Sequence, residues 1–196
     1  MKMTISLLQA FDWYKECPPD WKAKAKQDLI GQLKKQPFDN AAVKRGQDYE
    51  DLVCQALLTG QPVDPELECL RGMRQQAWLK GVTIKGFTFR GKMDFDNDER
   101  IVDLKTTKKY SMRSYVSKKQ HHIYCLSENK NLFSYKIALF PDESGLEHSK
   151  IHTIDLTLDL KKSELEMYAA VGEFQNWLIA EGLWELYYDV FNGGVA

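Results

Sequence analysis

The pattern of apolar and polar positions first predicts a long amphipathic helix. In residues 41–58 apolar side chains recur at helical spacing and form one stripe. Gly60 and Pro62 follow this segment and are typical of a helix end. The stripe consists of Tyr49, Leu52, Val53, Ala56 and Leu57. Further helices are expected over 1–40, with breaks at Pro18-Pro19 and Pro37, from Pro65 to Arg71, and over roughly 112–127. A last helix is expected from Ser163 to about Ala180, because Ser163 and Glu166 have the spacing of a capping box.

The apolar period changes to two from about Arg74, which predicts strands. Residues 86–95 alternate strictly, and we expect a single half-buried strand there. The polar segment 96–99 indicates a turn, and residues 101–105 form the next expected strand. Two later strands are expected over 132–140 and 151–158, with a loop at 141–145.

This order of elements predicts an α/β protein with a central mixed sheet flanked by helices. The length of 196 residues favours a single domain. Within it we expect an N-terminal helical extension over 1–40, a core over 41–160, and a C-terminal helix and tail over 161–196.

The composition excludes some classes of protein but does not indicate a function. Hydrophobic residues make up 43% and charged residues 28%, which is typical of a globular chain. No apolar run approaches the ~18 residues of a membrane span, and the N-terminus lacks the features of a signal peptide. The four cysteines are scattered, which excludes zinc-finger spacing and favours reduced thiols in a cytoplasmic protein. The net charge of -1 gives no indication of a nucleic-acid partner.

The hairpin expected around the turn at 96–99 carries the informative chemistry. If the turn centres between Asp98 and Glu99, Asp94 lies opposite Asp103, and Lys105 shares the face of Asp103. Opposed carboxylates repel each other unless a cation lies between them. Hard ions such as Mg²⁺ or Mn²⁺ prefer such oxygens, and the backbone carbonyl of Leu104 is a further candidate ligand. The side chains expected to point the other way, into the core, are those of Met93, Phe95, Val102 and Leu104.

A third carboxylate is available from the helix over 41–58. Glu50 borders its apolar stripe, so it reaches the same ion if that stripe packs on the hairpin; a surface salt bridge is the alternative. Lys105 is placed to assist a metal-bound water or to neutralise charge on a phosphate.

The segment between Asp103 and Glu128 contains no acidic residue, which predicts a local basic patch. Phosphodiester backbones are the natural ligands of such a patch, although a solubility face is the alternative. On the helix that follows, Gln120 and Tyr124 share one face and are candidates for substrate contact or for simple capping and packing. His121 and His122 are expected to be solvated or to contact phosphate. Besides Lys105, the patch comprises Lys108, Lys109, Arg113, Lys118 and Lys119.

The run GKMDFD, IVDLKTTK and QHHIY resembles the PD-(D/E)XK nuclease superfamily, in particular its RecB-like and phage-exonuclease branch. The match extends from Gly46 to Tyr124. It implies a restriction-endonuclease-like core with extra N-terminal helices and hydrolysis of DNA phosphodiesters with Mg²⁺ or Mn²⁺. The resemblance implies metal ligands at Glu50, Asp94 and Asp103, a catalytic lysine at Lys105, and a helix motif at Gln120 and Tyr124.

We therefore expect a metal-dependent deoxyribonuclease, and an exonuclease of phage or mobile-element recombination or replication rather than an endonuclease. DNA is the expected partner, with self-association or a recombination protein as further partners, no membrane, and the host cytoplasm as location. An iron–sulfur cluster is not expected, because only Cys125 lies in the C-terminal half. The alternatives are an endonuclease of the same fold, a catalytically silent nucleic-acid-binding or inhibitory protein, and a structural phage protein with a chance motif.

Overall fold

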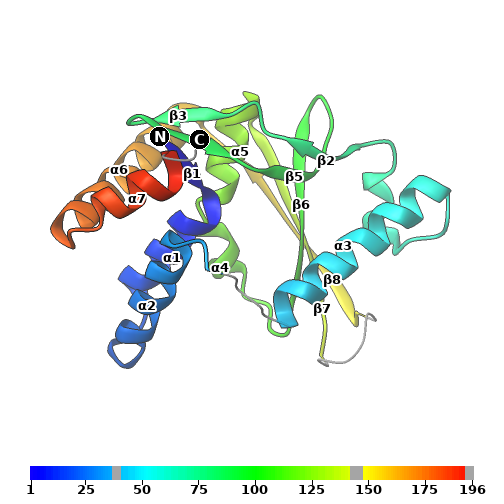
Figure 1. Ribbon diagram of the computed structural model, residues 1–196. Coiled ribbons are helices and arrows are strands. Elements are labelled where there is room, and N and C mark those ends of the chain that lie inside the picture. The colour runs from blue at the N-terminus through cyan, green and yellow to red at the C-terminus, as the bar shows by residue number, and fades with distance from the viewer. Residues whose placement is uncertain (37–40, 142–147, 193–196) are drawn as a thin grey trace.

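The computed structural model describes residues 1–36, 41–141 and 148–192. It contains a five-stranded sheet in the order β2-β5-β6-β7-β8 and a three-stranded sheet in the order β1-β4-β3 (Figure 1). The large sheet comprises β2 (Arg74–Trp78), β5 (Lys92–Asp96), β6 (Arg100–Thr107), β7 (Leu132–Leu139) and β8 (Lys150–Thr157). The small sheet comprises β1 (Lys2–Thr4), β3 (Val82–Ile84) and β4 (Phe87–Arg90).

The large sheet is mixed, as predicted. Neighbouring strands are antiparallel except β6 and β7, which pair in parallel from Arg100↔Leu132 to Thr107↔Leu139. A parallel pair requires a crossover connection, and the helices α4 (Met112–Val116) and α5 (Gln120–Glu128) supply it. The start of α5 is thereby placed beside the middle of β6.

The helices cover the two faces of the large sheet unequally. In Figure 1, α3 (Ala41–Thr59) lies on one side of the sheet, and the other long helices lie on the opposite side. Tyr49, Val53 and Leu57 of α3 are buried in one hydrophobic cluster with residues of β6, including Val102 and Leu104. The remaining helical elements are α1 (Ile5–Glu16), α2 (Lys22–Leu33), α6 (Leu160–Ala180), α7 (Trp184–Asn192) and two short 3₁₀ turns, Pro19–Trp21 and Pro65–Leu70.

The single strand predicted over 86–95 is wrong, because the chain breaks at Gly91 into β4 and β5 of two different sheets. A β-carbon at Gly91 would lie 3.6 Å from Leu79 Cδ1, so the chain passes close to its neighbours there. Within β5, Met93 packs in the larger core cluster, whereas Phe95 packs in the smaller one with α3. The alternating apolar residues of 86–95 therefore lie in two different sheets and pack into two different core clusters.

Several expected helix boundaries also change. The helix predicted over 112–127 is divided into α4 and α5, and the chain opens with β1 before the expected N-terminal helices. The last long helix begins at Leu160 rather than Ser163, since Asp159 Oδ1 accepts hydrogen bonds from the amides of Lys161 and Lys162. Leu52, expected in the buried stripe of α3, is 51% exposed.

Two expected features, the break at Pro37 and most of the loop at 141–145, lie outside the described residues. Within the described part of the chain, no helix is long and apolar enough to cross a membrane.

Candidate active site

The β5–β6 hairpin forms in the predicted register. Asn97 Oδ1 accepts hydrogen bonds from the amides of Glu99 and Arg100, at 3.0 Å and 2.9 Å, which fixes the turn. The paired residues are Phe95↔Val102 and Asp96↔Ile101, which is the register that sets position 94 opposite position 103 beyond the end of the ladder.

The two strands separate at the carboxylates. Backbone pairing of β5 with β6 ends at Phe95, and Asp94 Oδ2 instead accepts a hydrogen bond from the Leu104 amide at 2.7 Å. The side chain of Asp94 thus takes the place of a main-chain acceptor and lies against β6. Leu104 contributes its amide to this contact, while a ligand role for its carbonyl stays a prediction.

Asp103 is fully buried, and both of its carboxylate oxygens have close neighbours. Gln120 Nε2 donates a hydrogen bond to Oδ1 at 2.5 Å, and Lys105 Nζ lies 2.5 Å from Oδ2. Tyr124, one turn further along α5, is buried and donates its hydroxyl to the Lys92 carbonyl at 2.7 Å. The helix motif therefore holds the hairpin together from one side of the sheet.

The carboxylates lie close enough to perturb one another. Burial, and then the charge of Asp103, raise the pKa of Asp94 to about 8. Burial also raises the pKa of Glu50, which interacts with Lys105 and Asp103 and accepts a hydrogen bond at 3.4 Å from Gln76 Nε2. These interactions bring Glu50, Asp94 and Asp103 into one electrostatic cluster, although they come from three different elements.

Lys105 is the cation at the centre of this cluster. Burial lowers its pKa, but Asp103 and Asp94 outweigh burial and hold the pKa above its usual value, so the ammonium stays charged. The acids around this ammonium group supply hard oxygen donors of the kind that Mg²⁺ and Mn²⁺ prefer. By charge and chemistry the cluster suits such an ion. Among the described residues, however, no three His, Cys, Asp or Glu side chains are gathered closely enough to hold a metal as they stand.

Sequence comparisons give no relative for this chain: no protein-family profile matches it, and no curated protein matches it significantly. Solved structures do resemble it. An alkaline exonuclease from Laribacter hongkongensis matches with a TM-score of 0.52 and 15% identity, over 92% of this chain and 91% of that chain. A phage-related exonuclease from Haemophilus somnus matches with a TM-score of 0.51 and 14% identity, over 92% and 96%. The chain therefore shares its overall fold with these solved exonucleases.

The predicted basic patch lies beside the cluster but is accompanied by acids. Lys108, Lys109 and Arg113 are exposed, whereas Lys118 lies over the Tyr115 ring at 4.7 Å. Burial, and then Lys105, lower the pKa of Lys118. A groove of about 460 Å³ separates α4 from α1.

The α1 wall of this groove carries Asp12 and Glu16, opposite Arg113 and Lys118. Asp12 also interacts with Lys119. The acid-free run of sequence is therefore not an acid-free surface, because α1 folds against it.

The two adjacent histidines of α5 lie away from the cluster, which corrects the expectation that they are solvated or contact phosphate. His121 is buried, its Nδ1 lies 3.1 Å from the Tyr135 hydroxyl, and burial lowers its pKa to about 3. His122 Nδ1 lies 2.9 Å from Ser163 Oγ, and its Nε2 lies 3.2 Å from Glu166 Oε2. The His121 ring packs against Phe133 and Tyr135 of β7, whereas His122 contacts α6.

Two residues that sequence reasoning passed over belong to the surroundings of the site. Gln76, on β2, contacts Glu50 as described above. Asp96 is fully buried at the end of β5, where Arg74 and Lys130 both pair with its Oδ2. Asp96 stands in a polar stretch that reads as a turn, and no sequence signal separates it from its exposed neighbour Asp98.

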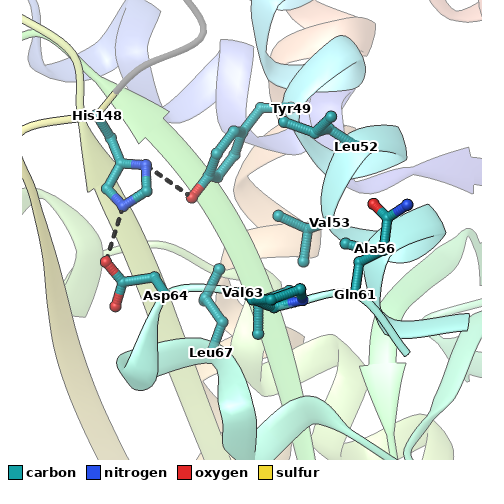
Figure 2. A pocket seen from close by; sticks show the side chains of 10 residues that line it. Tyr49, Leu52, Val53, Ala56, Gln61, Val63, Asp64, Leu67 and His148 are labelled. Carbon is teal, nitrogen blue, oxygen red and sulfur yellow. Dashed lines mark hydrogen bonds and ion pairs between the residues drawn. The ribbon is translucent and has the colours of Figure 1, made fainter. Parts of the chain in front are cut away.

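A separate cavity of about 430 Å³ lies between α3 and residues 61–67 and contains none of the predicted site residues (Figure 2). At its polar end His148 Nδ1 lies 3.3 Å from the Tyr49 hydroxyl, and His148 Nε2 lies 3.0 Å from Asp64 Oδ2. Since Tyr49 precedes Glu50, this chain of contacts fixes the part of α3 that carries the carboxylate.

Proposed function

We propose that this protein is a metal-dependent deoxyribonuclease that acts as an exonuclease. One observation carries the proposal: Asp94, Asp103 and Lys105 of one hairpin and Glu50 of α3 interact in a single cluster next to Gln120. Such a cluster of acids and one amine can support phosphodiester hydrolysis with a divalent ion. The shared fold with exonucleases is consistent with this chemistry and does not by itself establish it.

Glu50, Asp94 and Asp103 are the proposed ligands of Mg²⁺ or Mn²⁺, with the Leu104 carbonyl as a further oxygen donor. The bound ion would activate water and neutralise phosphate charge. A cation entering the cluster competes with Lys105 for Asp103, because the ammonium lies 2.5 Å from Oδ2. The pairing of Lys105 with Asp103 thus describes the charge balance of the cluster without the ion.

The residues of the chain then have distinct roles in the proposed reaction. Lys105, once freed from Asp103, stabilises the negative charge that develops on the phosphate. Gln120 keeps the Asp103 carboxylate in one orientation, and Tyr124 ties α5 to β5 through Lys92. The surface formed by Lys108, Lys109, Arg113, Lys118 and Lys119 binds the DNA backbone.

An exonuclease acting in phage or mobile-element recombination or replication is the form of this activity that we favour. The two solved exonucleases cover this chain almost completely, and a further structure of the Laribacter enzyme is a complex with dAMP. By analogy we propose linear DNA as substrate and mononucleotides as products. Self-association and a recombination protein partner belong to the same proposal.

The decisive experiment incubates the protein with linear, closed circular and end-labelled DNA, with and without Mg²⁺. We expect the protein to degrade linear DNA and to leave closed circular DNA intact. This degradation should require Mg²⁺. Lys105→Ala and Asp103→Asn should each lower kcat by roughly 10²-fold or more, because a charge aimed at the reacting group is lost. Lys161→Ala, an exposed lysine of α6, is the matched control and should retain full activity.

Cutting of closed circles would replace the exonuclease by the endonuclease alternative. Full activity in both Lys105→Ala and Asp103→Asn would remove the assignment. DNA binding without any turnover would identify the catalytically silent protein, and calorimetry with Mn²⁺ then shows whether the cluster still binds metal.

A further inference from the structure

Gln76 has a backbone conformation that the rest of the large sheet avoids. Its φ is +50°, and of the described non-glycine residues with positive φ it alone lies inside a strand. Residues other than glycine rarely adopt this backbone region, because their β-carbon comes too close to a carbonyl oxygen. Since Gln76 is exposed, tight packing around its side chain does not explain the conformation. Such conformations cluster at functional sites.

The distortion falls opposite a proposed metal ligand. Strand β2 pairs with β5 at Gln75↔Phe95 and at Ala77↔Met93, and the position skipped between them is Gln76 opposite Asp94. The same position separates Met93 and Phe95 into different core clusters. The left-handed residue therefore interrupts the β2–β5 ladder at the level of Asp94, whose side chain accepts a hydrogen bond from β6.

The side chain of Gln76 reaches α3 from this edge strand. Its Nε2 lies 3.4 Å from Glu50 Oε1 and 3.5 Å from Asp51 Oδ1. Two carboxylates of adjacent helix positions thus share one amide donor. A cavity of about 650 Å³, lined by Asp51, Gln55 and Gln76 among others, borders this contact.

We propose that Gln76 is a positioning residue for the carboxylate cluster: its left-handed backbone breaks the β2–β5 ladder beside Asp94, and its amide orients Glu50. The inference rests on the proposed function, since it assigns Gln76 to the divalent-metal site of that function. Gln76 contributes to this site in two ways, through its backbone conformation and through its side-chain amide. Different substitutions remove the two contributions.

The test measures Mn²⁺ binding by titration of the free-ion EPR signal, together with Tm in EDTA. Gln76→Gly keeps the left-handed backbone and removes the amide, so Mn²⁺ affinity should fall about tenfold. Its Tm should equal or exceed that of the unchanged protein, because glycine adopts positive φ without strain. Gln76→Val also removes the amide, and its β-branched side chain disfavours the left-handed backbone, so it should lower both Mn²⁺ affinity and Tm. Gln55→Ala removes an exposed amide from the same cavity and should change neither.

Wild-type Mn²⁺ affinity in Gln76→Gly would overturn the inference while leaving the proposed function intact. A Tm loss in Gln76→Gly as large as in Gln76→Val would also overturn it, because the role would then be structural. Absence of Mn²⁺ binding in the unchanged protein would overturn the metal-dependent function and this inference with it.

Discussion

Gln120 Nε2 donates a hydrogen bond of 2.5 Å to Oδ1 of Asp103, and this contact joins the first residue of α5 to the middle of β6. Both residues are buried, so the bond forms away from competing water. The crossover between two parallel strands thereby also orients the carboxylate at the centre of the site.

Replacement of Gln120 by alanine should affect both stability and activity. It leaves a buried carboxylate oxygen without its donor, which should lower the free energy of unfolding by about 1–3 kcal/mol. The loosened Asp103 should also reduce kcat by roughly 10-fold to 100-fold. Urea unfolding and DNA degradation assays measure the two effects. Gln27→Ala, on the exposed side of α2, is the control and should change neither.

The pKa of Asp94 predicts a pH dependence of the metal-free protein. Because the folded-state pKa, about 8, lies above the unfolded value, the folded state binds more protons between these values. This contribution to stability is complete at low pH and is lost as the pH rises towards 8. The free energy of unfolding in EDTA should therefore fall by up to about 1.4 kcal/mol per pH unit relative to Asp94→Asn. Parallel pH profiles of the two proteins would contradict the prediction.

Removal of charges from the basic patch should weaken DNA binding in a salt-dependent way. Arg113→Ala should reduce the slope of log K against log salt by about 1 if the guanidinium contacts one phosphate. Fluorescence anisotropy with labelled DNA in EDTA measures the slope. Glu16→Gln should strengthen binding, because α1 places this acid in the groove opposite Arg113. An unchanged slope in Arg113→Ala would place the DNA elsewhere.

Asp96 should matter for stability more than its position next to a turn suggests. Asp96→Ala leaves Lys130, itself nearly buried, without its carboxylate partner. Breaking a buried pair in this way should cost about 3–5 kcal/mol of unfolding free energy. The exposed Asp98, two residues further on, is the matched control, and Asp98→Ala should stay within about 0.5 kcal/mol. Equal urea midpoints for the two variants would refute the prediction.

Local patterns were sufficient for the hairpin register and for α3. The turn residues and the alternation around Asp94 and Asp103 specify which side chains face each other, because a shift of one residue would move Val102 and Leu104 to the opposite face of the sheet. The stripe of α3 likewise predicted burial of Tyr49, Val53 and Leu57 correctly. Both depend on neighbours in sequence.

Features that depend on distant segments were missed. The period of two continues through Gly91, although β4 and β5 belong to different sheets, because β1 at the N-terminus pairs with β4. The acids of α1 beside the basic patch and the covering of His121 and His122 have the same origin. In each, a segment far away in sequence supplies the surroundings.

The sequence by itself determined the long helix α3, the register of the hairpin and the acids and amine that these two elements carry. It could do so because side-chain periodicity and turn chemistry act over a few residues. Only the tertiary structure decided which oxygens Lys105, Gln120 and Gln76 contact, and which acids lie beside the basic patch. Those contacts join elements distant in sequence, and their geometry follows from how the helices pack on the sheet.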